Sequence, residues 1–368
     1  MKNNKKVIIL YPYYSGISGA YNRYLVLEKL LSKTNLRVKF ILIKDQKCKY
    51  IISRIMYKFI KFLKVEAIIF FYSVLRNFYF ITDYNPSITA LLSKNVFIQI
   101  HDVSWINKEF VRHNLFFYRI FRFFIKNYSN IITVSKTSMY AINKVSGRKK
   151  RISFLYNTVT EAFIKESNNI GKDDFIYENK RIIQSIDFNS PNILYIASLI
   201  ERKRHLDLLE SLSNNKNFFN VNLIGIPTDR KILEFIQARK SLNGNDIKSK
   251  INYYPKLSQK DLCYLLLFSS AYISTSMDEG FGIPVLEAEL YNIPLIIRDI
   301  DINRELFPKA KFFKTNSQLT ILLNDLKILS KSEIEERKKI ISLINQDNIN
   351  KLFSYSNLSK KIENIILN

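Results

Sequence analysis

Two glutamates bracket a glycine-containing loop in the second half of this 368-residue sequence. Glu279 opens the stretch EGFGIPVLE and Glu287 closes it. An apolar run that ends near Thr275 precedes the loop, and Pro284 suits the first turn of a helix. Ligands of open parallel sheets bind beyond the carboxyl ends of the strands, where a carboxylate accepts hydrogen bonds from neighbouring hydroxyls. The stretch therefore predicts a site for a sugar or a ribose.

The backbone of the same loop favours an anionic or oxygen-rich ligand. The N–H groups of Gly280–Ile283 lie at the expected N-terminus of a short helix, where a phosphate or another hydrogen-bonding oxygen is favoured. We expect this helix to end near Asn292, which tolerates a left-handed conformation, because Pro294 prevents its continuation. The alternative interpretation is that Glu287 only complements the helix dipole and that Glu279 is a solvated loop residue.

Two further candidates follow apolar runs. The segment ERKR, residues 201–204, places cations after the run Ile193–Ala197, although a solvated helix start has the same composition. His101 directly follows the run Val96–Ile100 and precedes Asp102. A lone histidine is more often structural, but a His-Asp pair at the end of a strand favours a functional role.

The elements that position these residues follow a regular alternation. Short apolar runs alternate with segments of helical spacing, which is typical of βαβ units on a parallel sheet. The first series predicts strands at Val7–Tyr11, Val38–Ile43, Ala67–Tyr72, Val96–Ile100, Ile131–Val134 and Ile152–Leu155. The second predicts strands at Ile193–Ala197, Val221–Ile224, Ile251–Tyr253, Ala271–Thr275, Leu295–Ile297 and Lys311–Phe313. We therefore predict an α/β protein with two Rossmann-like, doubly wound domains.

A polar, irregular stretch from about Asn168 to Pro191 separates the two series of strands. It predicts an N-terminal domain over residues 1–185 and a C-terminal domain over residues 186–350. Residues 351–368 are expected to form a helix that packs back towards the N-terminal domain.

Several of these segments resemble glycosyltransferase family four, a large group of retaining GT-B enzymes. EGFGIPVLEAELYNIP is similar to the family's signature of two glutamates separated by seven residues. YIASLIERKRHLDLLESL, IHDVSWI, ITVSKTS, YNTV and SGISGAYNRYL are similar to other family segments and occur in the family's order. The resemblance implies a GT-B fold with a deep cleft between its domains, in which the N-terminal domain binds the acceptor and the C-terminal domain binds the donor.

The resemblance also implies roles for individual residues. Glu279 would contact the donor sugar, and Glu287 would bind the ribose hydroxyls of the nucleotide. Lys203 would neutralise charge on the leaving diphosphate, and His101 would lie close to the donor sugar and the acceptor hydroxyl. Catalysis would thus rest on His101, Lys203 and Glu279. The other implied donor-binding residues are Gly16, Gly19, Ser198, Arg202, Tyr253, Leu257, Gly280, Phe281, Gly282 and Ile283.

One position departs from the family pattern. The family usually has arginine five residues before its lysine, whereas this sequence has Ser198. We therefore expect the diphosphate clamp to be weaker or to be completed by Arg202 or Arg204.

The implied reaction moves a hexose from a nucleotide-diphospho-sugar to a hydroxyl of a glycan acceptor, with retention at the anomeric carbon. The sequence offers no obvious covalent nucleophile, so the leaving phosphate is expected to take the acceptor's proton. Asp299 and Asp301 have the spacing of a metal-binding DxD motif but fit the family's loop-to-helix transition at this place. We expect no metal and no cofactor. A mannose donor and the synthesis of lipopolysaccharide O-antigen or capsule are favoured.

The charge of the chain is concentrated in its first half. The net charge is +25, and residues 1–150 hold 27 Lys and Arg against 6 Asp and Glu, a net +21. Basic and aromatic residues alternate over residues 47–64 and 110–128. Such helices bind anionic membrane surfaces, although packing of the aromatic face against the protein's own core is an almost equal alternative. We therefore expect a lipid-linked acceptor and peripheral association with the inner membrane.

Other features exclude several classes of protein. Cys48 and Cys263 form neither a disulfide framework nor a zinc motif, which favours a reduced, cytoplasmic setting. The longest apolar run, Ala67–Leu75, is shorter than a membrane span. Two rival hypotheses are a nucleic-acid-binding protein that uses the basic half and a GT-B enzyme of other chemistry, such as a nucleotide-sugar epimerase or a phosphorylase. Known nucleic-acid-binding motifs are missing from the sequence, so we expect no nucleic-acid partner.

Overall fold

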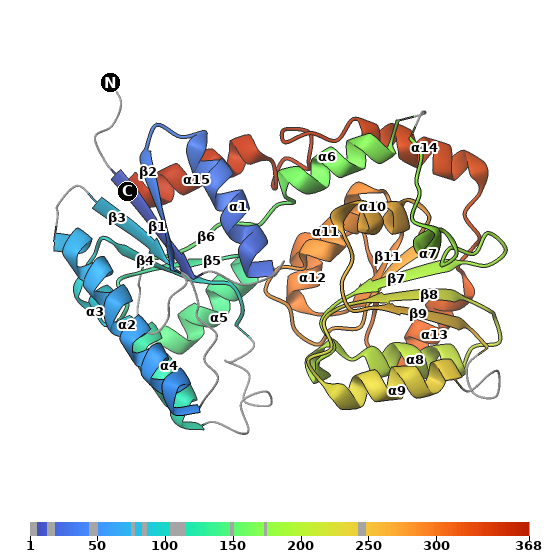
Figure 1. Ribbon diagram of the computed structural model, residues 1–368, viewed down its shortest axis with the longest axis horizontal. Coiled ribbons are helices and arrows are strands. Elements are labelled where there is room, and N and C mark those ends of the chain that lie inside the picture. The colour runs from blue at the N-terminus through green and yellow to red at the C-terminus, as the bar shows by residue number, and fades with distance from the viewer. Residues whose placement is uncertain are drawn as a thin grey trace. The chain divides into compact units, whose positions relative to one another are not determined.

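The computed structural model describes residues 6–12, 19–43, 51–74, 78–82, 87–103, 115–147, 151–172, 175–241 and 248–367. The chain folds into two compact units (Figure 1). Unit 1 consists of Met1–Thr158 and Asn350–Asn368, and unit 2 consists of Val159–Ile349. Each unit contains one parallel sheet of six strands, with helices on both faces.

The sheet of unit 1 has the strand order β2-β1-β3-β4-β5-β6. Its strands are β1 (Lys6–Pro12), β2 (Arg37–Ile43), β3 (Phe78–Thr82), β4 (Val96–Ile100), β5 (Asn130–Thr133) and β6 (Arg151–Phe154). Its helices are α1 (Gly19–Ser32), α2 (Ile51–Val74), α3 (Thr89–Leu92), α4 (Leu115–Asn127), α5 (Lys136–Ser146) and α15 (Tyr355–Leu367). Side chains of α2, α3, α4 and α5 share one buried cluster with β1, β3, β4 and β5, so these helices cover the same face of the sheet.

The prediction of a strand at Ala67–Tyr72 is wrong, because these residues form the second half of α2. Val65 and Ile69 recur at helical spacing and are completely buried in the core of unit 1. The strand between β1 and β4 is instead β3, which pairs in parallel with both. A short apolar run is compatible with a buried strand or with a buried helix. Here β3, and not Ala67–Tyr72, forms the hydrogen bonds to β1 and β4.

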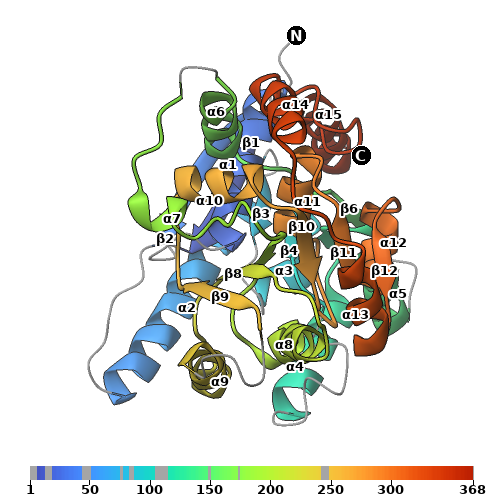
Figure 2. The same ribbon diagram turned by 90° about the vertical axis from the view of Figure 1, so that its right-hand side faces the viewer.

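The sheet of unit 2 has the strand order β12-β11-β10-β7-β8-β9. Its strands are β7 (Asn192–Ile196), β8 (Asn220–Ile224), β9 (Lys250–Tyr254), β10 (Ala271–Ser274), β11 (Leu295–Arg298) and β12 (Lys311–Phe313). Its helices are α6 (Glu161–Ile170), α7 (Lys180–Ile183), α8 (His205–Ser213), α9 (Arg230–Ser241), α10 (Gln259–Leu267), α11 (Ile283–Leu290), α12 (Asp301–Leu306), α13 (Asn316–Asn324) and α14 (Lys331–Ser342). Figure 2 shows α8, α9 and α13 on one face of this sheet and α10 and α11 on the other.

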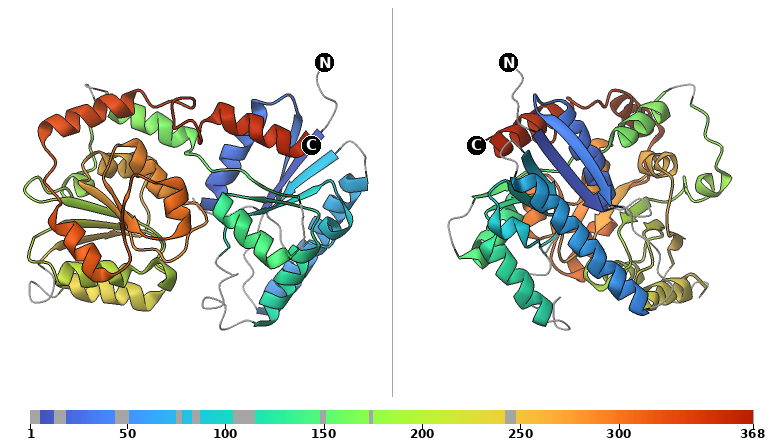
Figure 3. Two further views of the ribbon diagram at one scale, coloured as in Figure 1. Left: turned by 180° about the vertical axis from the view of Figure 1, so that it is seen from behind. Right: turned by 60° about the vertical axis from the view of Figure 1, so that its left-hand side comes forward.

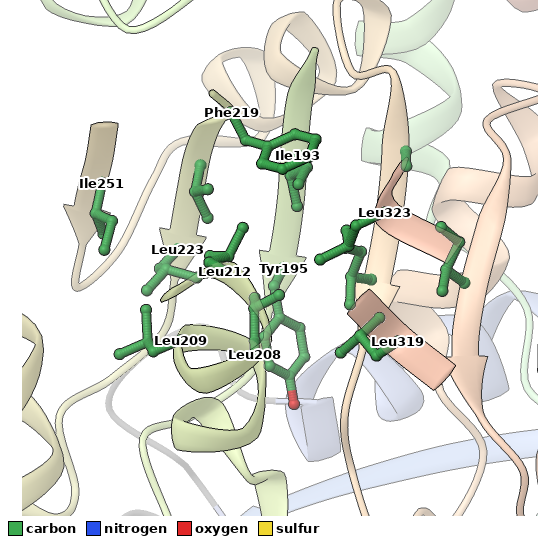
Figure 4. Close-up of a cluster of buried hydrophobic side chains, with 14 of the residues drawn as sticks. Ile193, Tyr195, Leu208, Leu209, Leu212, Phe219, Leu223, Ile251, Leu319 and Leu323 are labelled. Carbon is green, nitrogen blue, oxygen red and sulfur yellow. The ribbon is translucent and has the colours of Figure 1, made fainter. Parts of the chain in front are cut away.

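The core of unit 2 lies between the sheet and the helices α8, α9 and α13. Tyr195 of β7 and Leu223 of β8 meet leucines of α8 and α13, among them Leu208 and Leu319 (Figure 4). Ile193 and Phe219 are also fully buried in this cluster. The cluster anchors β7 and α8, which flank the basic segment of the sequence.

The division of the chain differs from the predicted one. The stretch expected to be a linker begins inside α6, and the first division between the units lies at Thr158 and Val159. Residues 159–185 belong to unit 2 because α6 packs against α10 and α14. At the other end of the chain, α15 packs against α1, and the backbone N–H of Asn35 donates to Glu363 at 3.2 Å.

Candidate functional site

The candidate site of unit 2 lies at the point where its strand order changes direction. β7 and β10 are hydrogen-bonded neighbours, although they are the first and fourth strands of this sheet along the chain. The connections that follow them lead away in opposite directions, which opens a crevice beyond their carboxyl ends. The loop after β7 contains Lys203, and the loop after β10 contains Glu279. Strand order therefore brings together two predicted residues that lie 76 positions apart.

The backbone around Lys203 is held rigidly. A 3₁₀ turn spans Glu201–Lys203, and Arg204 has a left-handed conformation with φ of 50°. The carbonyl oxygen of Lys203 accepts hydrogen bonds from the Tyr195 hydroxyl at 2.5 Å and from Thr275 Oγ1 at 2.9 Å. A left-handed non-glycine residue persists only where the surrounding structure enforces it, and these two bonds supply that constraint.

A second set of contacts joins the two loops directly. Arg202 Nη1 donates to the carbonyl oxygen of Asp278 at 2.8 Å, and the backbone N–H of Met277 donates to the carbonyl oxygen of Arg202 at 2.9 Å. Arg202 therefore holds the loop that contains Glu279. Nη1 of the Arg202 guanidinium is thus engaged within the protein, and the completion of a diphosphate clamp by Arg202 stays a prediction.

Lys203 and Glu279 form a close ion pair. Lys203 Nζ lies 2.5 Å from Glu279 Oε1, and the two side chains are only 10% and 16% exposed. A partly buried ammonium needs a compensating anion, and here the carboxylate supplies it. A ligand with a diphosphate and a hydroxylated sugar matches both groups, because it presents an anion to the ammonium and hydroxyl donors to the carboxylate.

The glycine-containing loop adopts a conformation that requires glycine at one position. Gly282 has a φ of 88°, which is strained for any L-residue with a side chain, and it precedes the first residue of α11, Ile283. Phe281 is buried, whereas Gly280 and Ile283 are partly exposed. Asn292 has the expected left-handed conformation, with φ of 52°, just beyond the end of α11.

Glu287 lies just beyond the first turn of α11. It is the fifth residue of α11 rather than a residue of its first turn, and it is only 7% exposed. Burial raises the pKa of its carboxyl group to about 8, so the group is largely protonated at neutral pH in the absence of a ligand. A protonated carboxyl both donates and accepts hydrogen bonds, which suits a pair of ribose hydroxyls.

The replacement Glu287→Gln is expected to change how stability depends on pH. The pKa of Glu287 is raised from 4.5 to about 8 by burial, so its favourable contribution is complete at low pH and is lost as the pH rises through 8. The melting temperature of the wild type should therefore fall relative to that of E287Q between pH 5 and pH 9. Thermal unfolding at several pH values tests this, with the exposed Glu336→Gln as a control. A difference in melting temperature between the wild type and E287Q that stays constant from pH 5 to pH 9 would contradict the prediction.

Three further predicted residues of unit 2 lie at or just after the ends of β7 and β9. Ser198 follows β7 and is partly exposed, and Leu257 is partly exposed after β9. The Tyr253 hydroxyl donates to the carbonyl oxygen of Gly225 at 2.8 Å. This bond ties the end of β9 to the end of β8, so the structure gives Tyr253 a positioning role.

Two predicted residues of unit 1 lie in the described chain. His101 follows β4, and Gly19 is the first residue of α1, whereas Gly16 lies outside the described residues. Burial, and secondarily the nearby Arg23, lower the pKa of His101 to about 3. The imidazole is thus neutral at physiological pH and suits a hydrogen-bonding role rather than that of a general acid. Its Nε2 is buried and has no partner among the described residues.

Sequence reasoning missed the residues that support the site. Arg298 is buried, donates to the carbonyl oxygens of Thr275 at 2.8 Å and Lys314 at 3.2 Å, and pairs with Asp207. It thereby holds Thr275, which in turn holds the backbone of Lys203. The sequence offers one local indication of this role, since Arg298 is a cation directly after the apolar run Leu295–Ile297. Its partners Thr275 and Asp207 lie far from it in the sequence.

The first aspartate of the DxD-like sequence, Asp299, forms internal ion pairs. Arg304 forms two hydrogen bonds with the carboxylate of Asp299, and Lys314 Nζ lies 3.7 Å from it. Within the described residues, no group of three or more His, Cys, Asp or Glu side chains is arranged to hold a metal ion.

Residues 177–346 match the family model of glycosyl transferases group 1. This part of the chain is therefore similar to the group 1 glycosyl transferases. The match confirms the family resemblance. The matched residues 177–346 include Lys203, Glu279 and Glu287 but not His101.

The similarity to curated relatives and to solved structures extends over more of the chain than residues 177–346. The O-antigen chain mannosyltransferase RfbU of Salmonella typhimurium is 24% identical over 232 residues, which are 61% of this chain and 58% of the relative. The mannosylglucosyl-3-phosphoglycerate synthase of Petrotoga mobilis is 26% identical over 285 residues, or 69% of this chain and 51% of the relative. The chain therefore spans little more than half the length of these curated relatives.

The structural comparisons confirm the predicted GT-B fold. HepE of Anabaena, solved in complex with UDP and glucose, has a TM-score of 0.67 at 15% identity over 97% of this chain and 98% of its own. WaaG, a glycosyltransferase involved in lipopolysaccharide biosynthesis, has a TM-score of 0.63 at 14% identity over 98% of this chain and 99% of its own. At these identities the comparison concerns the fold alone.

Proposed function

We propose that the chain is a retaining glycosyltransferase that moves a hexose from a nucleotide-diphospho-sugar to a hydroxyl of a glycan acceptor. The proposal rests above all on the ion pair of Lys203 with Glu279 at the strand-order switch point. A cation and a carboxylate fixed at this crevice, with Glu287 on the helix that follows, complement a diphosphate, a sugar and a ribose.

In the proposed reaction, the acceptor oxygen forms a bond to the anomeric carbon as the bond from that carbon to the diphosphate breaks. The leaving phosphate oxygen receives the acceptor's proton, and the nucleoside diphosphate departs. Lys203 stabilises the negative charge that develops on the diphosphate, and Glu279 orients the sugar through its hydroxyls. Neutral His101 contributes a hydrogen bond near the reacting hydroxyl. The residues perform these roles without a metal or cofactor.

The proposed pathway is the synthesis of a surface polysaccharide, either lipopolysaccharide O-antigen or capsule. RfbU of Salmonella typhimurium and WbdA of Escherichia coli, 29% identical over 123 residues, are both named as mannosyltransferases. These names favour mannose as the transferred sugar, and the net charge of +21 in the first half of the chain favours a lipid-linked glycan as the acceptor. Such an acceptor places the enzyme at the cytoplasmic face of the inner membrane.

A panel of nucleotide sugars tests the proposed function. The purified chain is incubated with GDP-mannose, UDP-glucose, UDP-galactose or UDP-N-acetylglucosamine, with and without lipid-linked glycan, and nucleoside diphosphate release is measured. We expect release with one donor, an α-linked product by NMR when that donor is an α-linked hexose, and no loss of activity in EDTA. Release of no nucleoside diphosphate from any donor would contradict the proposal. Isomerised nucleotide sugar would indicate an epimerase instead.

A further inference from the structure

The long helix α2 of unit 1 is apolar on two opposite sides. Val65 and Ile69 point into the core of unit 1. On the other side, Met56, Phe59, Ile60 and Leu63 are 58%, 61%, 56% and 50% exposed, and Phe71 continues the same stripe. These five residues have helical spacing, so they form one outward stripe, here named the outer α2 face. Figure 3 shows α2 along the outside of unit 1.

The surroundings of the outer α2 face are positively charged. Lys64 is exposed at the edge of this stripe, directly after Leu63, whereas the exposed Lys58 lies on the other side of the helix, seven residues before Val65. The acidic residue of α2, Glu66, is turned towards α3, because Thr89 donates to its Oε2 from both the backbone N–H at 2.8 Å and Oγ1 at 2.7 Å. The helix therefore presents apolar side chains and cations to solvent, while its carboxylate is engaged within the fold.

Helix α4 adds cations on the same side of the sheet. Arg119, Arg122 and Lys126 are exposed, α4 contains no acidic residue, and Phe123 is 57% exposed. Ile125 of α4 lies in the same core cluster as Val65 of α2, so both helices cover one face of the sheet. The described aromatic side chains of α4 are thus divided between the core and the surface, and among the described side chains α2 has the larger exposed apolar stripe.

We propose that the outer α2 face inserts among the headgroups of an anionic lipid bilayer, with the lysines and arginines of α2 and α4 contacting lipid phosphates. An interfacial helix buries its apolar side by about 5–10 Å and gains from cations beside anionic lipid. The described residues contain no helix that is both long and apolar enough to cross a bilayer, so this contact is peripheral.

The chemistry of the outer α2 face favours lipid over two other occupants. A nucleic-acid backbone needs cations along its track, whereas aliphatic side chains occupy the centre of this face and offer no hydrogen bond to phosphate. A symmetric contact with a second copy would bring the like-charged lysines of two α2 helices together, in a half of the chain with a net charge of +21. Of these three occupants, an anionic bilayer alone matches both the apolar stripe and the cations beside it.

Vesicle flotation tests this surface directly. The wild type is expected to float with phosphatidylethanolamine–phosphatidylglycerol vesicles (3:1) and to remain in solution with phosphatidylcholine vesicles. Lys64→Gln with Lys126→Gln, at exposed lysines of α2 and α4, should weaken partitioning roughly 30-fold, because each cation contributes about 1 kcal/mol near an anionic surface. Phe59→Ser with Leu63→Ser should weaken it at least about tenfold through lost apolar burial. Matched controls are I321S/L343S, at two exposed apolar positions of unit 2, and K216Q/K331Q, at two exposed lysines.

Three results would overturn the proposal. The first is equal partitioning of the wild type and F59S/L63S. The second is a wild-type dimer, seen by light scattering, that F59S/L63S dissociates while neither protein binds vesicles. The third is binding to a single-stranded oligonucleotide that exceeds vesicle binding. Failure of this proposal can be distinguished from failure of the proposed function. The variant F59S/L63S should lose vesicle binding but retain transfer to a water-soluble acceptor. A wild type that binds vesicles but transfers no sugar would contradict only the proposed function.

Discussion

The variant Lys203→Met is expected to lose transferase activity by about 100- to 1,000-fold, the loss typical of removing one group that stabilises developing charge. In the proposed reaction its ammonium stabilises the leaving diphosphate, and the backbone of Lys203 is held by the hydrogen bonds that its carbonyl oxygen accepts from Tyr195 and Thr275. Methionine preserves most of the side-chain volume, so the packing beside Tyr195 remains. Steady-state kinetics with the identified donor measure the effect, and it should appear mainly in kcat because the charge develops as the bond breaks.

Two matched variants separate this catalytic effect from loss of the ion pair. K203M alone leaves the carboxylate of Glu279 without its cation, so the variant should also lose stability. K203M/E279Q removes both charges and should recover stability but not activity, and the exposed Lys216→Met should leave both unchanged. Full activity in K203M, with a normal melting temperature, would falsify the assignment of Lys203.

The variant Gly225→Ala is expected to destabilise unit 2 by roughly 3 kcal/mol or more, with a fall in melting temperature of about 10 °C. Gly225 follows β8, and an added Cβ would lie 1.8 Å from the carbonyl oxygen of Ala197 and 2.5 Å from its carbonyl carbon. Both atoms are backbone, so no side-chain rotation relieves the contact. Relief requires the end of β7 to move, and β7 leads directly to the loop that contains Lys203.

The control for this variant is Gly147→Ala. Gly147 has a φ of 64° with no atom within 4 Å of an added Cβ, so its replacement costs only the backbone strain of about 1 kcal/mol. Thermal and urea unfolding compare the two variants. Equal losses of stability would show that the close approach of Gly225 to Ala197 is not the cause.

Strand positions in unit 2 were largely predictable, whereas one strand of unit 1 was not. Each of the strands β7 to β12 has a short apolar run bounded by polar or turn-forming residues, and the predicted runs overlap them. In unit 1, the run Ala67–Tyr72 has the same composition but belongs to α2. The difference arises because Val65, which precedes the run, and Ile69, which lies within it, are spaced four residues apart as on one side of a helix, and a short window that begins at Ala67 leaves Val65 out.

The sequence by itself determined the chemical inventory of this protein: the two glutamates around a glycine-containing loop, the basic segment before α8, the end of α11 near Asn292, and the basic first half. These are local properties of residue type and spacing. The tertiary structure alone decided that Lys203 contacts Glu279, that Arg298 and Thr275 hold them in place, that Glu287 is buried, and that one side of α2 faces solvent. Such contacts depend on strand order and on which surfaces pack together, and these arise from interactions between residues far apart in the chain.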